Sequence, residues 1–175
     1  MGEIRSTLDI IMEKTRGLTM TEEEKAEYKQ KELVGKVRGL IQKYLDKTLS
    51  EDRLQVEVTA LGEKEQDDIK QVIIEETIPK IALGDDNEPV LKILESAIGL
   101  DTTPIKEILT DFEGRLEQER NVRKKTMMNR LEEKGISGSA VMPNIAADPE
   151  WARSVVQLEE TLKGKLNSLK LLIEK

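Results

Sequence analysis

The segment that decides the fold is DPEWARSVVQLEETLKGKLNSLKLLIEK, residues 148–175. Apolar residues follow one another in it at intervals of three or four, which places them on one face of a helix: Trp151, Val155, Leu158, Leu162, Leu166, Leu169 and Ile173. Asp148 and Pro149 form a typical helix start. The spacing is close to a coiled-coil seam with one extra interval of four. The segment therefore predicts a helix over 149–175 that packs against a second helix.

The preceding segment, residues 104–134, predicts that second helix. Thr103 and Pro104 indicate its N-cap and first turn, and Gly135 indicates a left-handed C-cap. At 1.5 Å per residue the helix would be about 46 Å long, which is more than the width of a small domain. Its apolar residues are dense up to Leu116 and sparse beyond it. We expect an antiparallel hairpin in which the charged stretch 117–125 projects.

Helical spacing also predicts shorter helices in the first hundred residues. Thr21 and Glu24 form a capping box, Ser50 and Asn87 are expected N-caps, and a helix that restarts at Pro79 is expected to end at Gly84. The expected helices span about 3–16, 22–46, 51–62, 64–83 and 88–98. The fold class is all-α, with six or seven helices and a long C-terminal hairpin that carries the shorter ones. The expected divisions are 1–48, 49–100 and 101–175, within one structural unit.

The composition excludes several chemistries. The chain has 175 residues, 36% of them charged, with no cysteine and no histidine. Disulfides, thiol chemistry and imidazole catalysis are therefore excluded, and no motif supplies a catalytic constellation or the ligand spacing of an EF-hand. We expect a protein that is not an enzyme and that holds no cofactor and no metal. With no apolar stretch near the ~20 residues of a membrane helix, the expected location is the cytoplasm.

The net charge of −7 is unevenly distributed. Residues 1–62 carry a net −1, residues 63–114 carry −9 and residues 115–175 carry +3, which sum to −7. General nucleic-acid binding needs a dominant positive face, so nucleic acid is an unlikely partner. The distribution favours charge-complementary packing within one chain or between two. An alternative is binding of nucleic acid or an anionic surface by Arg120, Arg123, Lys124 and Lys125.

Residues 135–147, GISGSAVMPNIAA, contain no charged side chain. Such a long apolar connection is unusual as a solvated loop. It can lie across the helices that it joins and cap the end of the bundle, or it can dock on another protein. A third possibility, an anion site at its glycines, is disfavoured because Asp148 would repel the anion and no lysine follows the glycines as in a nucleotide-binding loop.

The function expected from these patterns is that of a non-enzymatic interaction or scaffold protein. It would act through helix-to-helix contacts with a protein partner or with itself, as a homo-oligomer. The expected partner-binding residues come from the uncharged stretch and from the seam of the last helix: Val141, Met142, Pro143, Ile145, Trp151, Leu158, Leu162 and Leu169.

Three segments, MGEIRSTLDIIMEKT, VRGLIQKYLD and GISGSAVMPNIAADPEW, resemble a set of small bacterial hypothetical proteins with no assigned activity. The resemblance spans most of the chain. It implies a bacterial cytosolic origin, and it implies no functional residue.

Overall fold

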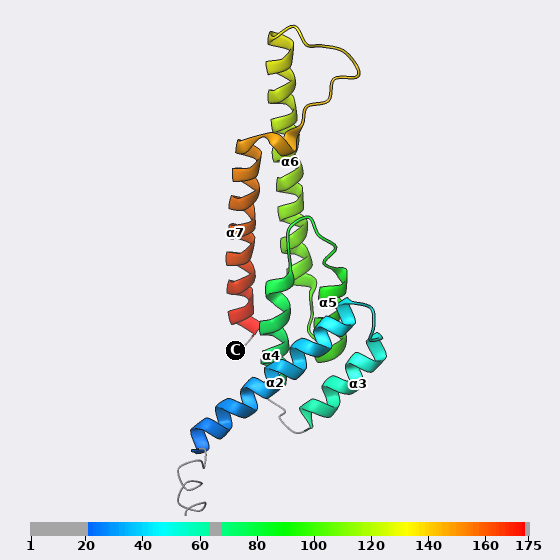
Figure 1. The fold of residues 1–175 in the computed structure, drawn as a ribbon, viewed down its shortest axis with the longest axis vertical. Coiled ribbons are helices and arrows are strands. Elements are labelled where there is room, and N and C mark those ends of the chain that lie inside the picture. The colour runs from blue at the N-terminus through cyan, green and yellow to red at the C-terminus, as the bar shows by residue number, and fades with distance from the viewer. Residues whose placement is uncertain (1–20, 64–67, 174–175) are drawn as a thin grey trace, which may run out of the picture. The chain divides into compact units, whose positions relative to one another are not determined.

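The computed structural model describes residues 21–63 and 68–173. Within these residues the fold is all-α, as predicted, with no strand (Figure 1). The α-helices are α2 (Glu22–Leu45), α3 (Glu51–Gly62), α4 (Asp68–Thr77), α5 (Glu88–Ile98), α6 (Thr103–Glu133) and α7 (Pro149–Ile173). Two short 3₁₀ helices, η1 (Ile78–Lys80) and η2 (Ile145–Ala147), follow α4 and precede α7. The helix predicted over residues 3–16 lies outside the described residues.

The chain divides into two compact units, residues 1–36 and 37–175. In the first unit, the predicted capping box is present at the start of α2. The backbone N–H of Thr21 donates to Glu24 Oε2 at 2.8 Å, and that of Glu24 donates to Thr21 Oγ1 at 3.1 Å. Residues 22–32 are all exposed, and ion pairs between neighbouring turns join Lys25 to Glu22 and Lys31 to Glu27. This half of α2 is therefore stabilised locally by its cap and its charges.

The second unit contains an aliphatic core with a single buried aromatic ring, Phe112. Helix α5 contacts both α3 and α4, and α7 contacts η1 as well as α6. The side chains that are at most 2% exposed include Val37, Ile41, Leu54, Val72, Ile73, Ile93, Leu94, Ile105, Leu162 and Leu166. Residues 49–100 and 101–175 both lie in this unit.

The end of α4 corrects the sequence prediction. The α-helix ends at Thr77, two residues before Pro79. The 3₁₀ helix η1 then runs only from Ile78 to Lys80, so the helical structure ends before Gly84. Proline lacks an N–H and disfavours helical geometry in the residue before it, so the regular helix ends there. Gly84 has a φ of +84° and lies in the turn that follows. The hydroxyl of Thr77 is fully buried and has no hydrogen-bond partner.

Asn87 is the N-cap residue of α5, as predicted, but its side chain makes no capping hydrogen bond. The side chain is turned back onto the preceding loop, where it accepts from the N–H of Ala82 at 3.0 Å and donates to the carbonyls of Ala82 and Asp85. Asp86 Oδ1 accepts from the N–H of Glu88 instead. The buried amide of Asn87 therefore holds the loop closed, and a neighbouring carboxylate supplies the capping bond.

Helix α6 begins one residue earlier than predicted. Thr102 is the N-cap residue, and Asp101 Oδ1 accepts from the N–H of Thr103 at 2.9 Å. The buried hydroxyl of Thr102 donates to the carboxylate of Glu95, which Lys106 also contacts at 2.8 Å. These bonds fasten the start of α6 to the end of α5.

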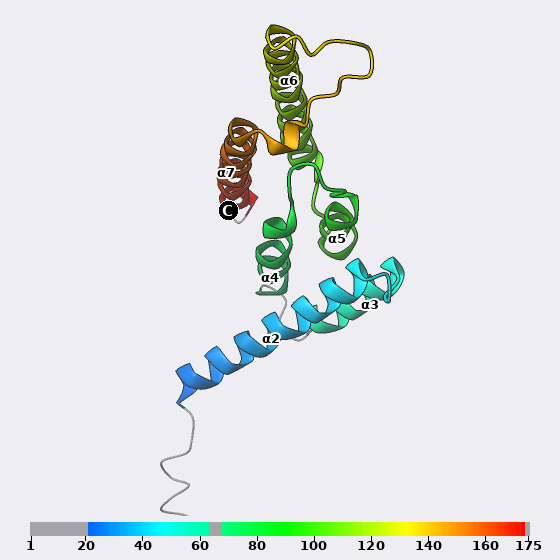
Figure 2. The same ribbon diagram turned by 45° about the horizontal axis from the view of Figure 1, so that its top comes forward.

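Helices α6 and α7 form the predicted long antiparallel hairpin and run side by side in Figures 1 and 2. Their register follows from three contacts along their length. Lys165 lies 5.1 Å from the centre of the Phe112 ring, Ser154 donates to Glu119 at 3.0 Å, and Arg123 bonds to Glu150. Because α7 starts opposite Arg123, the last ten residues of α6 extend about 15 Å beyond it.

Candidate interaction surface at the end of the hairpin

The two halves of the hairpin are covered to different degrees. The buried residues of α6 are Ile105, Leu109 and Phe112, and those of α7 are Leu162 and Leu166. Beyond these positions, towards the loop, no described side chain of either helix is buried. We call this less covered half, residues 119–158, the hairpin tip. A helix pair gains most of its stability from a buried apolar face, so the tip is the weakly packed part of the hairpin.

A polar cluster joins the two helices within the tip. Arg123 Nε donates to Glu119 Oε1 at 2.8 Å, its terminal nitrogen bonds to Glu150, and Ser154 donates to Glu119. The pKa of Glu119 lies below its ordinary value. The hydrogen bond from Arg123 is the main cause, and the hydrogen bond from Ser154 is the next. The Arg123 side chain is only 23% exposed. Charged groups thus replace apolar contacts where the two helices diverge.

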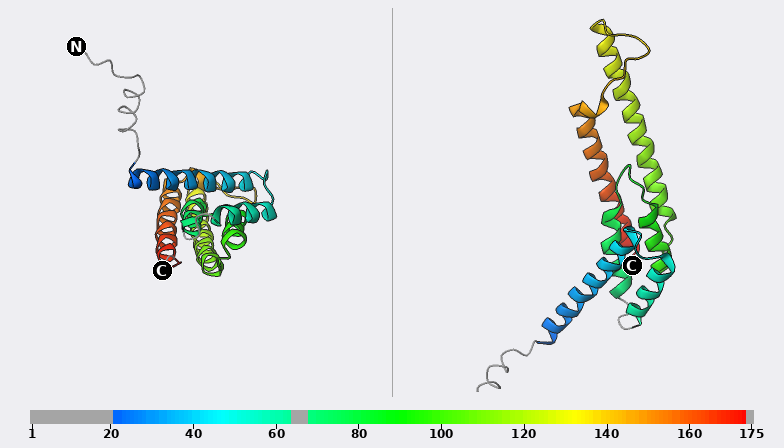
Figure 3. Two further views of the ribbon diagram at one scale, coloured as in Figure 1. Left: turned by 90° about the horizontal axis from the view of Figure 1, so that it is seen from below. Right: turned by 45° about the vertical axis from the view of Figure 1, so that its right-hand side comes forward.

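The chain leaves α6 through the glycine C-cap that the sequence predicts. Gly135 has a φ of +76°, its N–H donates to Glu132, and the N–H of Ile136 donates to Leu131 at 2.9 Å. This is the Schellman arrangement, in which a left-handed residue satisfies the last carbonyls of a helix. Gly138, with a φ of +138°, allows the loop to turn back beside α6, as the right-hand view of Figure 3 shows.

The uncharged loop is exposed over most of its length. Residues 135–140 are all exposed, Ile136 is 48% exposed and Met142 is 82% exposed. Val141, Pro143 and Ile145 are half-buried, and η2, which begins at Ile145, contacts both helices of the hairpin. Only the second part of the loop therefore lies against the helices, and the side chain of Met142 is exposed to solvent.

The remaining predicted partner-binding residues lie on α7. Trp151, Leu158 and Leu169 are half-buried. Leu162 is 1% exposed, because α7 packs against α6 and η1 of the same chain. Leu162 therefore contributes to the packing of the hairpin and offers no accessible surface. Apart from Leu169 near the end of α7, the accessible predicted residues lie in the loop and the first turns of α7.

Two exposed valines of the tip were missed by the sequence analysis. Val122 on α6 is 58% exposed, and Val156 on α7 is 53% exposed. In the sequence, Val122 is adjacent to Arg123 and Val156 is two residues from Ser154, and both of these neighbours belong to the polar cluster. Val122 continues the sparse apolar spacing of α6, whereas Val156 falls outside the apolar stripe of α7.

The predicted basic patch is not a set of four available cations. Arg123 is engaged by Glu119 and Glu150, and Arg120 lies 3.9 Å from Glu117. Lys124 and Lys125 are exposed and form no ion pair within residues 21–63 and 68–173. Two lysines would release few counterions from a phosphate backbone, with a salt slope of only about −2. The geometry gives little support to nucleic-acid binding at this site.

In the described part of the chain, no group of three or more acidic side chains could hold a metal ion. None of the described helices is long and apolar enough to cross a membrane. A pocket of about 290 Å³ between α6 and α7 is lined by Arg115 and by members of the polar cluster, and holds no paired acid and base suited to catalysis. Comparisons with protein-family models, curated proteins and solved structures find no match to the chain.

Proposed function

We propose that this chain is a non-enzymatic helical interaction protein that engages another protein through the hairpin tip. The observation that carries the proposal is the exposed, uncharged loop at the end of the hairpin, with Met142 82% exposed in a chain in which 36% of the residues are charged. An exposed apolar segment of this kind costs solubility unless a partner covers it. Methionine suits such a surface because its flexible side chain adapts to the groups that it meets.

A second copy of the chain is the leading partner. The hairpin tip belongs to residues 115–175, which carry a net charge of +3, and α4, α5 and the start of α6 belong to residues 63–114, which carry a net charge of −9. A second copy therefore offers a surface of opposite charge to the one that carries the loop. The half-buried Trp151, Leu158 and Ile145 would add apolar contacts around Met142 when the tip is covered.

Sedimentation velocity over a range of concentrations tests the proposal. The tip variant carries Val141→Ser, Met142→Ser and Ile145→Ser. A control variant carries Val56→Ser, Leu171→Ser and Leu172→Ser, which remove three apolar side chains that are 62–67% exposed elsewhere. We expect the wild type and the control to associate and the tip variant to remain monomeric. The single tryptophan, Trp151, lies beside the loop, so its fluorescence should follow the association.

The second arm of the test identifies a partner other than the chain itself. Nuclease-treated lysate of the source cell is passed over immobilised wild type and tip variant, with circular dichroism to show that both are folded. A protein retained by the wild type and lost with the tip variant supports docking on another protein. A wild type that is monomeric at every concentration and retains no protein would contradict the proposal.

A further inference from the structure

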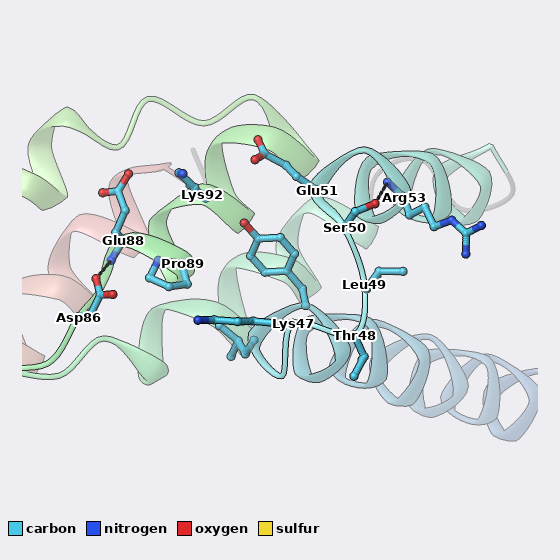
Figure 4. A pocket seen from close by; sticks show the side chains of 12 residues that line it. Lys47, Thr48, Leu49, Ser50, Glu51, Arg53, Asp86, Glu88, Pro89 and Lys92 are labelled. Atoms are coloured by element: carbon cyan, nitrogen blue, oxygen red, sulfur yellow. Dashed lines mark hydrogen bonds between the residues drawn. The ribbon is translucent and has the colours of Figure 1, made fainter.

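A pocket in the second unit lies away from the hairpin, where the turn after α2 meets the starts of α3 and α5 (Figure 4). Its volume is about 690 Å³, within the range of small-molecule sites. The residues that matter for its chemistry are Tyr44, Lys47, Glu51, Glu88, Pro89 and Lys92. They come from three separate segments, so no contiguous sequence motif indicates the pocket.

Hydrogen bonds to backbone groups hold the walls of the pocket in place. The N–H groups of Thr48 and Leu49 and the hydroxyl of Thr48 all donate to the carbonyl of Lys43. Ser50 Oγ accepts from the N–H of Arg53, and Asp86 Oδ1 accepts from that of Glu88, as the dashed lines in Figure 4 show. The walls are therefore formed before any ligand arrives, which lowers the entropic cost of binding.

Lys47 is in a conformation that lysine rarely adopts. Its φ is +57°, and it is the one non-glycine residue with positive φ among the described residues. It occupies the left-handed position of a Schellman C-cap at the end of α2, since Lys47 N–H donates to Tyr44 and Thr48 N–H donates to Lys43. Glycine would be cheaper here by about 1 kcal/mol. The strain places the Lys47 side chain in the lining of the pocket.

Charges of both signs face the pocket without pairing to one another. Lys47, Lys92, Glu51 and Glu88 line it, and none of the four forms an ion pair with any described residue. In Figure 4 the side chain of Lys47 extends towards Pro89. Burial, followed by the negative charges of Glu51 and Glu88, raises the pKa of Tyr44 above its ordinary value of 10.0. Both carboxylates therefore act on the same phenol.

We propose that this pocket binds a small zwitterion with an apolar or aromatic frame, such as a free amino acid or a dipeptide. The ammonium group would face Glu51 and Glu88, and the carboxylate would face Lys47 and Lys92. The frame would lie against Tyr44 and Pro89. Charged hydrogen bonds of this kind give orientation, and the ring and proline supply apolar contact. The site is independent of the function proposed for the hairpin tip.

Titration of the ¹⁵N-labelled full chain, followed by NMR, tests the proposal with four probes. L-phenylalanine and glycyl-L-phenylalanine carry both charges, N-acetyl-L-phenylalanine lacks the positive one, and L-phenylalaninamide lacks the negative one. We expect saturable shifts of the amides of residues 44–53 and 88–92 with at least one zwitterion. The zwitterion that binds more tightly indicates whether the natural ligand has the size of an amino acid or of a dipeptide. Each blocked form should bind about tenfold more weakly.

Lys47→Gly separates binding from folding. Glycine relieves the left-handed strain, so the melting temperature should rise, whereas loss of the ammonium group should weaken zwitterion binding about tenfold. Glu51→Gln should also weaken binding, and Glu57→Gln, on α3 outside the pocket, should leave it unchanged. The proposal is overturned if neither zwitterion gives saturable shifts, if the blocked forms bind equally well, or if Lys47→Gly binds as the wild type does.

Discussion

Replacement of Leu162 by alanine tests whether α7 is covered by its own chain. Leu162 is 1% exposed and is one of the two buried residues of α7. A buried Leu→Ala change removes apolar contact and leaves a cavity, at a cost of 2–5 kcal/mol. We take about 3 kcal/mol, because α7 sits at the edge of the core and can partly collapse onto the gap. In a protein of this size that lowers the melting temperature by about 6–12 °C.

The matched control is Leu171→Ala on the same helix, where the leucine is 62% exposed. That change should alter the free energy of unfolding by less than about 0.5 kcal/mol. Urea unfolding followed by circular dichroism, at a concentration where the chain is monomeric, measures both. Equal effects of the two changes, or a cost below about 1 kcal/mol for Leu162→Ala, would refute the intramolecular packing of the seam.

Three further predictions concern stability. Thr77→Val should raise the free energy of unfolding by about 1 kcal/mol in urea titrations, because it replaces a buried hydroxyl that has no partner with a methyl group; a loss of stability would show that the hydroxyl is satisfied. Gly114→Ala should stabilise α6 by up to about 1 kcal/mol, since a Cβ there meets nothing within 4 Å, whereas Gly135→Ala, at a φ of +76°, should destabilise it by a similar amount; effects of the same sign in thermal melts would contradict the C-cap. The pKa of Glu119 is lowered in the folded chain, so its contribution to stability is present above the ordinary value of 4.5 and is lost as the pH falls through the folded value. Glu119→Gln should therefore reduce stability at pH 7 and flatten the decline below about pH 4.5, and an unchanged pH profile would exclude this role.

The sequence predicted the helices well because their signals are local. The capping box at Thr21, the glycine C-cap at Gly135 and the hairpin were all expected, and all are present. These features depend on residues that are at most six apart, or on the repeat of apolar positions along one helix.

The features that the sequence did not predict depend on contacts between distant residues. Asn87 is the N-cap residue of α5, as predicted, but its amide bonds to the carbonyl and N–H groups of the folded loop and not to the first turn of the helix. The exposure of Met142 and the burial of Leu162 depend on which parts of α7 and of the loop pack against the rest of the chain, and the apolar seam of α7 is continuous on both sides of that point. The pocket around Lys47 combines three segments, so its charges meet only in the folded chain.

The most direct test of the proposed interaction is photo-cross-linking from the loop itself. Benzoylphenylalanine is placed at position 142, or at the similarly exposed position of Val56 on α3 as a control, and the full chain is irradiated in living cells. A probe in place of Met142 should give one discrete adduct, whose mass identifies a second copy of the chain or another protein, and the control position should give none. No adduct from position 142, or the same adducts from both positions, would contradict an interaction through the hairpin tip.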